Sequence, residues 1–464
     1  MQELKEKLRF YGQEHLIEAL EKGTQEERGS LKAQLEELDF ARLDHLIREY
    51  VLQKKVFTVP DDLSPAPFFP FPPRTDAQKA YYAKAEEEGK RLLRSGKVGM
   101  LTVAGGQGTR LGYDGPKGTF PITPVRGKSL FQYFAEKLRR VSEKYGSVLH
   151  WFIMTSKIND AATKAFFSSH RYFGFPAENI HFFTQGTMPA VGYDGKLLLG
   201  GPGTLALSPD GHGGTFLALK RSGTLAKIQE LGIEYLSYFQ VDNPLVPMAD
   251  PLFLGLHRLE GSEMSSRMLP KTNAKEKLGN FCITKGKLTI IEYSDMPDAL
   301  AERKNPDGTL SFLAGSPAIH VISTSFAARL TEKGFLDLPW HRADKKVPFL
   351  DAQGVLVKPE TPNAVKLESF IFDALPLAEH PVILEGAREK HFAPTKNPTG
   401  VDSVESCRKM LSDRDASRLA LAGICVPENA VIEISPAKVC DDEDAVMFLK
   451  EMKVKEEGGK YSYE

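Results

Sequence analysis

The fold is decided by a short apolar run that passes into a glycine-rich loop, VGMLTVA at residues 98–104 followed by GGQGTRLG at residues 105–112. A run of this kind, ended by glycines, is typical of a strand that is buried on both faces. The glycines remove side chains where the strand becomes a loop, so backbone N–H groups can approach a ligand closely. This stretch predicts a sheet strand with a ligand-binding loop at its carboxyl end.

Strand-like and helix-like stretches alternate on the carboxyl side of this loop. Strands separated by helices of such length indicate βαβ units and a mainly parallel sheet, so we expect an α/β fold with a doubly wound central sheet. A later stretch, residues 288–293, has an antiparallel character. The alternating segments are strands at 149–154, 180–183 and 233–241 and helices at 159–169 and 215–231.

The flanks of this region differ from it in pattern. Apolar residues at three- and four-residue spacing predict helix from residue 1 to about 55, and the proline-rich residues 60–73 form a connector. A charged helix is expected after the connector, at about residues 76–95. Beyond Pro394 we expect a short helix near 404–411 and a strand at 430–434. The predicted domains are a helical N-terminal region with its connector (1–95), a central domain that contains the alternating strands and helices (96–393) and a small C-terminal subdomain (394–464).

Composition excludes several classes of protein. The 464 residues carry a formal net charge of -1, so the chain has no uniform basic field with which to bind nucleic acid. No stretch approaches 18 uninterrupted apolar residues, the N-terminus does not resemble a signal peptide, and the four cysteines are not spaced as a metal knuckle. We expect a cytoplasmic protein with no nucleic-acid or membrane partner. The sequence does not indicate an oligomeric state.

The glycine loop matches neither of two common nucleotide motifs. It has no Walker spacing, and the dinucleotide fingerprint is broken because Leu111 stands at its third glycine, which argues against a nicotinamide-dependent oxidoreductase. A plain glycine turn is the alternative reading. We favour phosphate binding because the loop follows a buried strand and carries the cations Arg110 and Lys117.

The loop and the motifs that follow it resemble the UDP-sugar pyrophosphorylase family, and within it the UDP-N-acetylhexosamine pyrophosphorylase branch. The resemblance extends from about residue 10 to about residue 400. Its ordered motifs are GGQGTRLG (105–112), TQGTMPA (184–190), PDGHGG (209–214), VDN (241–243), VPFLD (347–351), PNAVKLESFIFD (362–373) and PTKN (394–397).

This resemblance implies a nucleotide-diphospho-sugar transferase fold, with a Rossmann-like sheet, and transfer of a uridylyl group from UTP to a sugar 1-phosphate by in-line attack on the α-phosphorus. It implies a Mg²⁺ ion on Asp242, with Mn²⁺ as the alternative, although an isolated aspartate would otherwise be read as a turn residue. Gln185 and Lys396 would likewise be read as solvated surface groups without it. The other roles it assigns are catalytic for Arg110, Lys117 and Lys396, nucleotide-binding for Gly105, Gly106, Gln185 and Gly211, and sugar-binding for His212, Asn243, Gly279, Glu292, Ser316 and Lys366.

Two departures from the branch pattern bear on the sugar. His212 stands where that branch has asparagine, and Ser316 and Ile319 replace two further asparagines whose amides suit sugar hydroxyls or an N-acetyl group. N-acetylglucosamine 1-phosphate is the expected acceptor. The alternatives are a glucose 1-phosphate or broad-specificity uridylyltransferase and, more remotely, an inactive relative that serves as a regulator.

Overall fold

The computed structural model describes residues 1–54 and 58–464. The chain divides into two compact units, and each is assembled from three separate stretches. Unit 1 comprises Met1–Thr58, Gln185–Gly214 and Asp337–Ala374, and unit 2 comprises Val59–Thr184, Thr215–Leu336 and Leu375–Glu464. The units therefore interleave along the sequence, whereas the three domains expected from the sequence follow chain order and stay a prediction.

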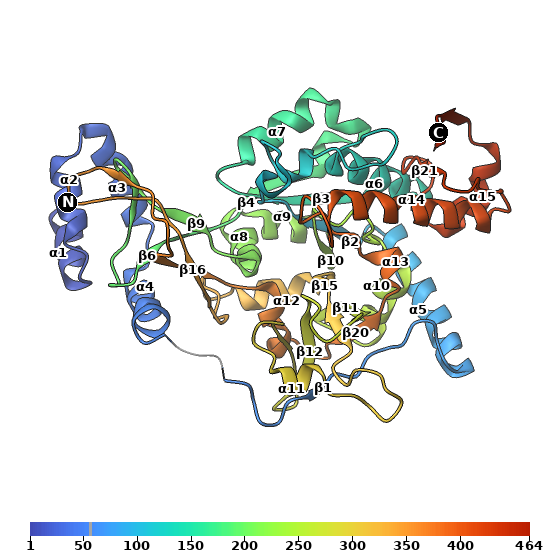
Figure 1. Ribbon diagram of the computed structural model, residues 1–464, viewed down its shortest axis with the longest axis horizontal. Helices are drawn as coiled ribbons and strands as arrows, with labels where there is room; N and C mark the ends of the chain where they lie inside the picture. The colour runs from blue at the N-terminus through green and yellow to red at the C-terminus, as the bar shows by residue number, and fades with distance from the viewer. Residues whose placement is uncertain (55–57) are drawn as a thin grey trace. The chain divides into compact units, whose positions relative to one another are not determined.

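A large mixed sheet forms the centre of unit 2 (Figure 1). One part of it is parallel, in the order β10-β2-β3-β4, with Val103 of β2 beside Gln240 of β10 and Met154 of β3. Neighbouring parallel strands end at one edge, so the loops that follow them meet there. The bounds are β2 Val98–Val103, β3 His150–Thr155, β4 Ile180–Thr184 and β10 Tyr235–Gln240, which confirms the four predicted strands.

The remainder of the sheet is mostly antiparallel. β15 pairs antiparallel with β10 and with β11, and the hairpin β12–β13 confirms the antiparallel character expected near residues 288–293. The α/β fold class is confirmed, with a sheet that is parallel where its loops carry the predicted nucleotide motifs. These strands are β1 Ser64–Pro65, β11 Met264–Pro270, β12 Gly279–Thr284, β13 Lys287–Ile291, β14 Ala314–Ser316, β15 His320–Ser323 and β20 Val382–Glu385.

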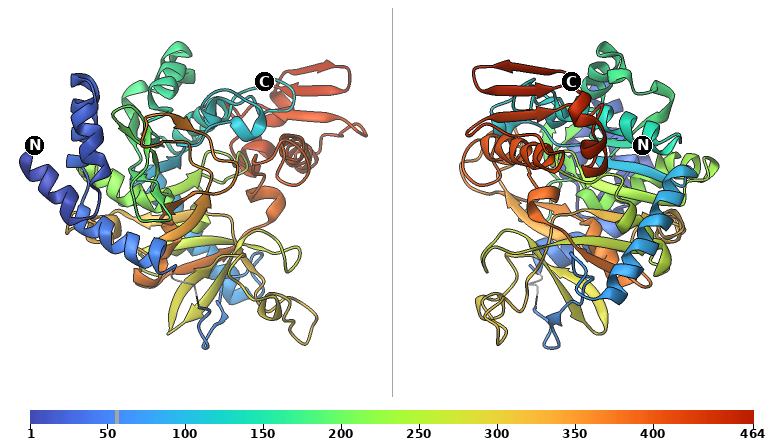
Figure 2. Two further views of the ribbon diagram at one scale, coloured as in Figure 1. Left: turned by 60° about the vertical axis from the view of Figure 1, so that its left-hand side comes forward. Right: turned by 90° about the vertical axis from the view of Figure 1, so that its right-hand side faces the viewer.

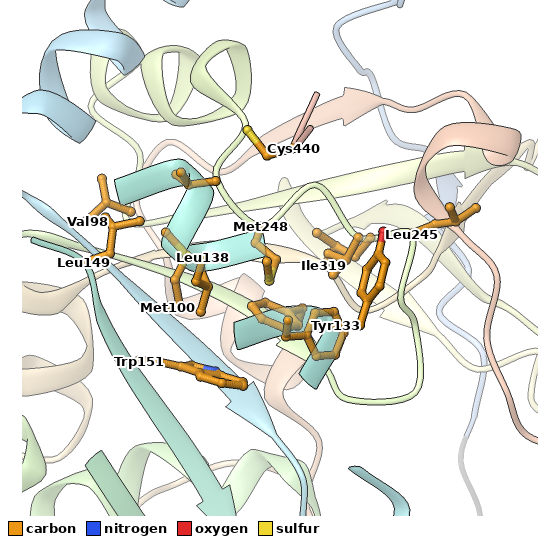
Figure 3. Close-up of a cluster of buried hydrophobic side chains, with 14 of the residues drawn as sticks. Val98, Met100, Tyr133, Leu138, Leu149, Trp151, Leu245, Met248, Ile319 and Cys440 are labelled. Atoms are coloured by element: carbon orange, nitrogen blue, oxygen red, sulfur yellow. The ribbon is translucent and has the colours of Figure 1, made fainter. Parts of the chain in front are cut away.

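Helix α6 (Leu130–Tyr145) closes one face of the parallel strands. Its Phe131 and Phe134 meet the ring of Trp151 on β3, with ring centroids 6.2 and 6.5 Å apart. Figure 3 shows Met100, Leu138 and Trp151 in this buried cluster. Trp151 also donates a 2.7 Å hydrogen bond to Thr102, which satisfies its only polar atom.

Helices α5 (Asp76–Arg94) and α10 (Pro251–Leu259) pack closely because each presents a glycine to the other. A Cβ built at Gly89 would lie 1.8 Å from the carbonyl oxygen of Pro251, and one at Gly255 would lie 1.6 Å from that of Ala85. Any side chain at either position would push the backbones apart. The predicted helix at 76–95 is confirmed.

Two helix predictions were wrong in extent. The stretch 215–231 is divided by Gly223, whose φ of 76° is left-handed, into α8 (Thr215–Arg221) and α9 (Thr224–Glu230). Helix α14 (Val404–Leu421), expected to end near 411, continues for ten further residues. Its polar Arg414 and Asp415 are buried and paired at 2.6 Å, so hydropathy did not reveal this part of the helix.

The C-terminal stretch adds a small sheet to unit 2. Strand β21 (Val431–Ile434) pairs with β23 (Lys460–Tyr463), which pairs with β22 (Val454–Glu457), and this sheet is drawn in red in Figure 2. Helix α15 (Asp442–Phe448) packs on α14 over a core that includes Leu419 and Ile432. The predicted strand near 430–434 is confirmed.

Unit 1 combines the N-terminal helices with four small sheets in the described residues. Its core joins residues from all three stretches of the unit, among them Leu31, Val191 and Val365. The predicted helical region is confirmed as far as Leu52, and residues 55–57 lie outside the described residues. The elements are α1 Gln2–Phe10, α2 His15–Lys22, α3 Gln25–Glu36, α4 Phe40–Leu46, the π-helix η1 Ile47–Leu52, β5 Thr187–Pro189, β6 Val191–Gly192, β7 Leu199–Gly201, β8 Thr204–Leu205, β9 Leu207–Pro209, η6 His212–Gly214, β16 His341–Lys345, β17 Phe349–Leu350, β18 Leu356–Val357 and β19 Ala364–Glu368.

The remaining helices are short. In the described residues no helix has the length and apolar character needed to cross a membrane. The remaining helices are η2 Thr109–Leu111, η3 Lys117–Thr119, α7 Asp160–Ser169, η4 Arg171–Gly174, η5 Ala177–Asn179, α11 Asp298–Ala301, α12 Thr324–Leu330, η7 Ile371–Leu377, α13 Arg388–His391 and η8 Leu449–Glu451.

Candidate functional site

The glycine loop begins directly after β2, at the sheet edge where the strand order reverses. A Cβ built at Gly106 would meet nothing within 4 Å, and Gly106 is exposed, so the protein's own packing does not require glycine there. At Gly108, in contrast, a Cβ would lie 2.7 Å from the ring of Tyr113. Packing against Tyr113 thus restricts the loop at Gly108, while the backbone at Gly106 stays open, as a phosphate-binding loop requires.

Lys117 and Asp242 meet at this edge although 125 residues separate them. Nζ of Lys117 lies 3.0 Å from Oδ2 of Asp242, and both side chains are largely buried. The contact follows from topology, because Asp242 ends the β10 segment and β10 is the parallel neighbour of β2. Two predicted functional residues from different motifs are therefore in direct contact.

The charge state of Asp242 is set by two lysines. Burial opposes its ionisation, but the charges of Lys117 and Lys396, together with the hydrogen bond from Lys117, outweigh burial and lower the pKa of Asp242. The carboxylate is ionised and only 8 % exposed. Such a group needs cationic partners, and any divalent cation bound here would join two ammonium groups already present.

Lys396 is positioned by the segment around residues 391–396. The backbone N–H of Thr395 donates to the carbonyl of Asp242 at 2.9 Å, which ties this segment to the end of β10. Nζ of Lys396 lies 5.6 Å from the ring centre of Phe392. Asn243 completes the attachment, since its amide donates to the carbonyl of His391 at 2.8 Å and accepts from the N–H of Ala393 at 2.9 Å.

This attachment gives Asn243 a structural task that the sequence did not reveal. Both ends of its buried amide are used by the backbone of residues 391–393. Its sugar contact stays a prediction. Arg110 lies in η2 with an exposed side chain, close in sequence to the glycines, so its cation is accessible to an anionic ligand.

Three predicted sugar-binding residues come together at one end of the antiparallel strands. Gly279 of β12 is the direct partner of Ser316 on β14. A Cβ built at Gly279 would lie 2.6 Å from Cγ2 of Ile290 and 3.1 Å from Oε1 of Glu292, so both side chains pack against the glycine. Ile319, by contrast, is buried in the hydrophobic core, so of the two replaced asparagines only Ser316 retains a partly exposed polar group.

Unit 1 carries the other predicted residues. Gln185 is 6 % exposed and donates a 2.7 Å hydrogen bond to the carbonyl of Gly211. Gly211 has a φ of 86°, and a Cβ there would lie 2.2 Å from the carbonyl oxygen of Ser369. Glycine is therefore obligatory at 211, and the amide of Gln185 is fixed against this turn rather than being a solvated loop side chain.

His212 is held by the backbone and by aromatic rings. Its Nδ1 accepts the N–H of Ile371 at 3.1 Å, and its ring stacks on Phe370 with centroids 5.2 Å apart. Burial and the charge of His341 lower the pKa of His212 to about 4. The imidazole is therefore neutral near pH 7 and, with Nδ1 accepting, carries its proton on Nε2.

Lys366 lies on β19 opposite Ala343 of β16 and is partly exposed. The structure thus groups Gln185, Gly211 and His212 within unit 1. Within unit 2 it groups the glycine loop with Lys117, Asp242 and Lys396.

Sequence reasoning missed one residue that contacts the glycine loop, the fully buried Asn159. Its side chain donates to the carbonyls of Ala104 and Gly106 at 3.0 and 3.2 Å. Asparagine at the start of a predicted helix is an ordinary capping signal, so nothing in the sequence showed that its amide reaches the loop of the neighbouring strand.

A second group of potential metal ligands, Cys440, Asp441 and Asp444, lies away from these residues in the C-terminal part of unit 2. Arg140 pairs with Asp444 at 2.9 Å and Lys144 with Asp441 at 2.6 Å. The basic side chains of α6 already neutralise these carboxylates, so this group is an ion-pair network that attaches α15.

Comparison with known proteins agrees with the motifs. The family model described as "UTP--glucose-1-phosphate uridylyltransferase" matches residues 69–417. "UDP-N-acetylglucosamine diphosphorylase 1" of Arabidopsis thaliana is 35% identical over 439 residues, which cover 88% of this chain and 82% of the relative. "UDP-N-acetylglucosamine pyrophosphorylase" of Saccharomyces cerevisiae is 37% identical over 380 residues, with coverages of 79% and 80%.

Among solved structures, the uridine diphosphate N-acetylglucosamine pyrophosphorylase from Trypanosoma brucei, crystallised in complex with an inhibitor, superposes with a TM-score of 0.81. It is 28% identical, and the match covers 96% of this chain and 94% of that one. The resemblance read from the sequence motifs is confirmed. The chain belongs to the UTP–glucose-1-phosphate uridylyltransferase family and is therefore an enzyme of the nucleotidyltransferase class.

Proposed function

We propose that this protein transfers a uridylyl group from UTP to N-acetylglucosamine 1-phosphate, releasing pyrophosphate and forming UDP-N-acetylglucosamine. The observation that carries the chemistry is the contact between Lys117 and Asp242 beside the open glycine loop, with Lys396 close enough to lower the pKa of the same carboxyl. The relatives named above, which are UDP-N-acetylglucosamine pyrophosphorylases or diphosphorylases by name, support this acceptor.

The reaction requires positioning and charge stabilisation rather than a nucleophile from the protein. An oxygen of the sugar phosphate, already anionic, attacks the α-phosphorus of UTP while the bond to the β-phosphate breaks, so no proton has to be removed. Negative charge gathers on the departing pyrophosphate. Arg110 and Lys117 stabilise it, and Lys396 holds the phosphate of the acceptor.

A divalent cation, Mg²⁺ by preference, fits the site through Asp242. Mg²⁺ is commonly bound by only one or two carboxylates, with substrate phosphates and water as the other ligands. The buried Asp242 is an ionised oxygen donor of the kind this ion prefers. The cation would neutralise phosphate charge, while the two lysines fix the position of the carboxylate.

For the acceptor sugar, unit 2 brings together Gly279, Glu292 and Ser316, which would contact the sugar ring. The sugar-binding role of His212 in unit 1 stays a prediction. A glucose 1-phosphate acceptor remains the alternative, favoured by the hydroxyl of Ser316 and the imidazole of His212 in place of amides.

The test is pyrophosphate release from UTP and Mg²⁺ with N-acetylglucosamine, N-acetylgalactosamine, glucose and galactose 1-phosphates in parallel. We expect the highest kcat/KM with N-acetylglucosamine 1-phosphate. A clear preference for glucose 1-phosphate would overturn the acceptor but not the uridylyl transfer. No turnover with any acceptor, from protein that binds UTP, would favour the inactive regulator. A cytoplasmic location and the absence of nucleic-acid and membrane partners stay predictions.

A further inference from the structure

Asn159 is the side chain that joins the glycine loop to the neighbouring strand. It follows β3 and immediately precedes α7, and it is fully buried. Its Oδ1 accepts from the backbone N–H of Ser156 at 2.8 Å and from the Ser156 hydroxyl at 3.1 Å. Its Nδ2 donates to the carbonyls of Ala104 and Gly106.

The orientation of this amide is fixed by the chemistry of its partners. The N–H of Ser156 can only donate, and the two carbonyls can only accept. Rotating the amide by 180° would place oxygen against oxygen at Ala104 and Gly106 and would place an NH₂ group against the N–H of Ser156. Only one orientation of the Asn159 amide therefore allows its hydrogen bonds to both Ser156, which follows β3, and the glycine loop.

Holding these carbonyls determines where the loop directs its N–H groups. In a trans peptide the N–H points opposite to the carbonyl of the same plane. The N–H of Gly105 shares a plane with the carbonyl of Ala104, and the N–H of Gln107 shares one with the carbonyl of Gly106. Both N–H groups must point away from Asn159, and in the described residues neither makes a backbone hydrogen bond.

The same carbonyl also positions the catalytic lysine. The backbone N–H of Lys117 donates to the carbonyl of Gly106 at 3.0 Å, so this oxygen accepts from both Asn159 and Lys117. The carbonyl oxygen of Gly106 thus sets both the direction of the loop's N–H group at Gln107 and the backbone position of Lys117.

We propose that Asn159 is a positioning residue for the nucleotide, which orients the N–H groups of Gly105 and Gln107 toward the phosphates of UTP. The inference rests on the proposed uridylyl transfer only in naming UTP as the ligand. Asn159 itself is buried behind the loop and does not touch the substrate.

The experiment compares Asn159→Asp and Asn159→Ala with the wild type. Asn159→Asp keeps the acceptor for Ser156 but turns a carboxylate oxygen toward two carbonyls, while Asn159→Ala removes all four bonds. The control is Asn363→Ala in unit 1, because Asn363 also accepts from and donates to backbone, through the N–H and carbonyl of Val347 at 2.8 and 3.0 Å. Each protein is tested for UTP binding by calorimetry, for KM of UTP and of the sugar phosphate separately, and for melting temperature.

We expect both Asn159 variants to weaken UTP binding and raise its KM on the order of tenfold or more, with Asn159→Asp the worse, while the KM of the sugar phosphate changes by less than about twofold. Asn363→Ala should lower the melting temperature without altering UTP binding. Equal losses for both substrates, or unchanged UTP binding in an Asn159 variant that is less stable, would overturn the proposal. Wild-type protein that binds UTP but does not turn it over would instead count against the proposed function.

Discussion

The contact between Lys117 and Asp242 can be tested by a double-mutant cycle of Lys117→Met and Asp242→Asn. Two unit charges 3.0 Å apart attract by about 5 kcal/mol at an effective dielectric constant of about 20. Desolvation of two largely buried side chains offsets much of this, and Lys396 partly compensates Asp242 when Lys117 is removed. We therefore expect a coupling free energy of about 2 kcal/mol, near the upper part of the range for residues in contact.

The chain offers a clean probe for this measurement, because each unit contains one of its two tryptophans. With Trp340 replaced by phenylalanine throughout, the fluorescence of the buried Trp151 reports urea unfolding of unit 2 alone. Metal should be excluded with EDTA so that only the protein pair is measured.

Kinetics of the same variants test the catalytic role. Lys117→Met should lower kcat/KM by about 10²–10³-fold, the usual effect of removing a group that stabilises transition-state charge. A coupling below about 0.5 kcal/mol together with kcat within about twofold of the wild type would refute both the ionic contact and the role of Lys117.

Three further predictions follow from particular residues. Gly255→Ala should destabilise unit 2 by about 3 kcal/mol or more because its Cβ would overlap the carbonyl of Ala85, whereas Gly29→Ala in α3, where a Cβ meets nothing within 4 Å, should be neutral or slightly stabilising by urea titration. The pKa of His212 is about 4, below its ordinary 6.5, so as pH falls the unfolded chain binds a proton on this imidazole before the folded chain does, and the fold loses stability. His212→Gln should therefore reduce the loss of stability between pH 6.5 and 4. The sugar preference of the wild type should not change between pH 6 and 8, because His212 stays neutral over that range. EDTA should abolish pyrophosphate release while the melting temperature changes by less than about 2 °C, and added Mg²⁺ should restore turnover; activity that survives chelation would exclude a metal on Asp242.

Much of the fold could be read from local pattern. The short apolar run at 98–104 ends in glycines, a pattern that is typical of a buried strand. The helix at 76–95 is preceded by Thr75, whose side chain caps it. The pattern failed where tertiary contacts decide. The second half of α14 is polar in composition yet buried, because Arg414 pairs with Asp415 and bonds Tyr133 at 2.6 Å. The break at Gly223 also escaped notice, since a lone glycine inside a helical pattern is often tolerated.

Sequence motifs named the members of the candidate site, whose roles stay predictions, but they did not reveal the contacts between those members. Lys117 and Asp242 were each identified by motif, yet their ion pair depends on the pairing of β2 with β10, which no local pattern specifies. Asn159 lay in no recognised motif, and its hydrogen bonds to the glycine loop depend on the pairing of β3 with β2. Asn243 shows the reverse case, because the motif suggested a ligand contact while the structure shows its amide bound to the backbone of residues 391–393.

The interleaving of the two units has a consequence for how the chain folds during synthesis. The core of unit 1 needs Val365 and Leu367 as well as the N-terminal helices, so those helices cannot complete their packing until residues near 370 have left the ribosome. At about 5–20 residues per second, this leaves their apolar faces uncovered for tens of seconds. We expect the nascent chain to depend on chaperone protection over this interval, and a single proteolytic cut in the mature protein would not release either unit as one continuous fragment.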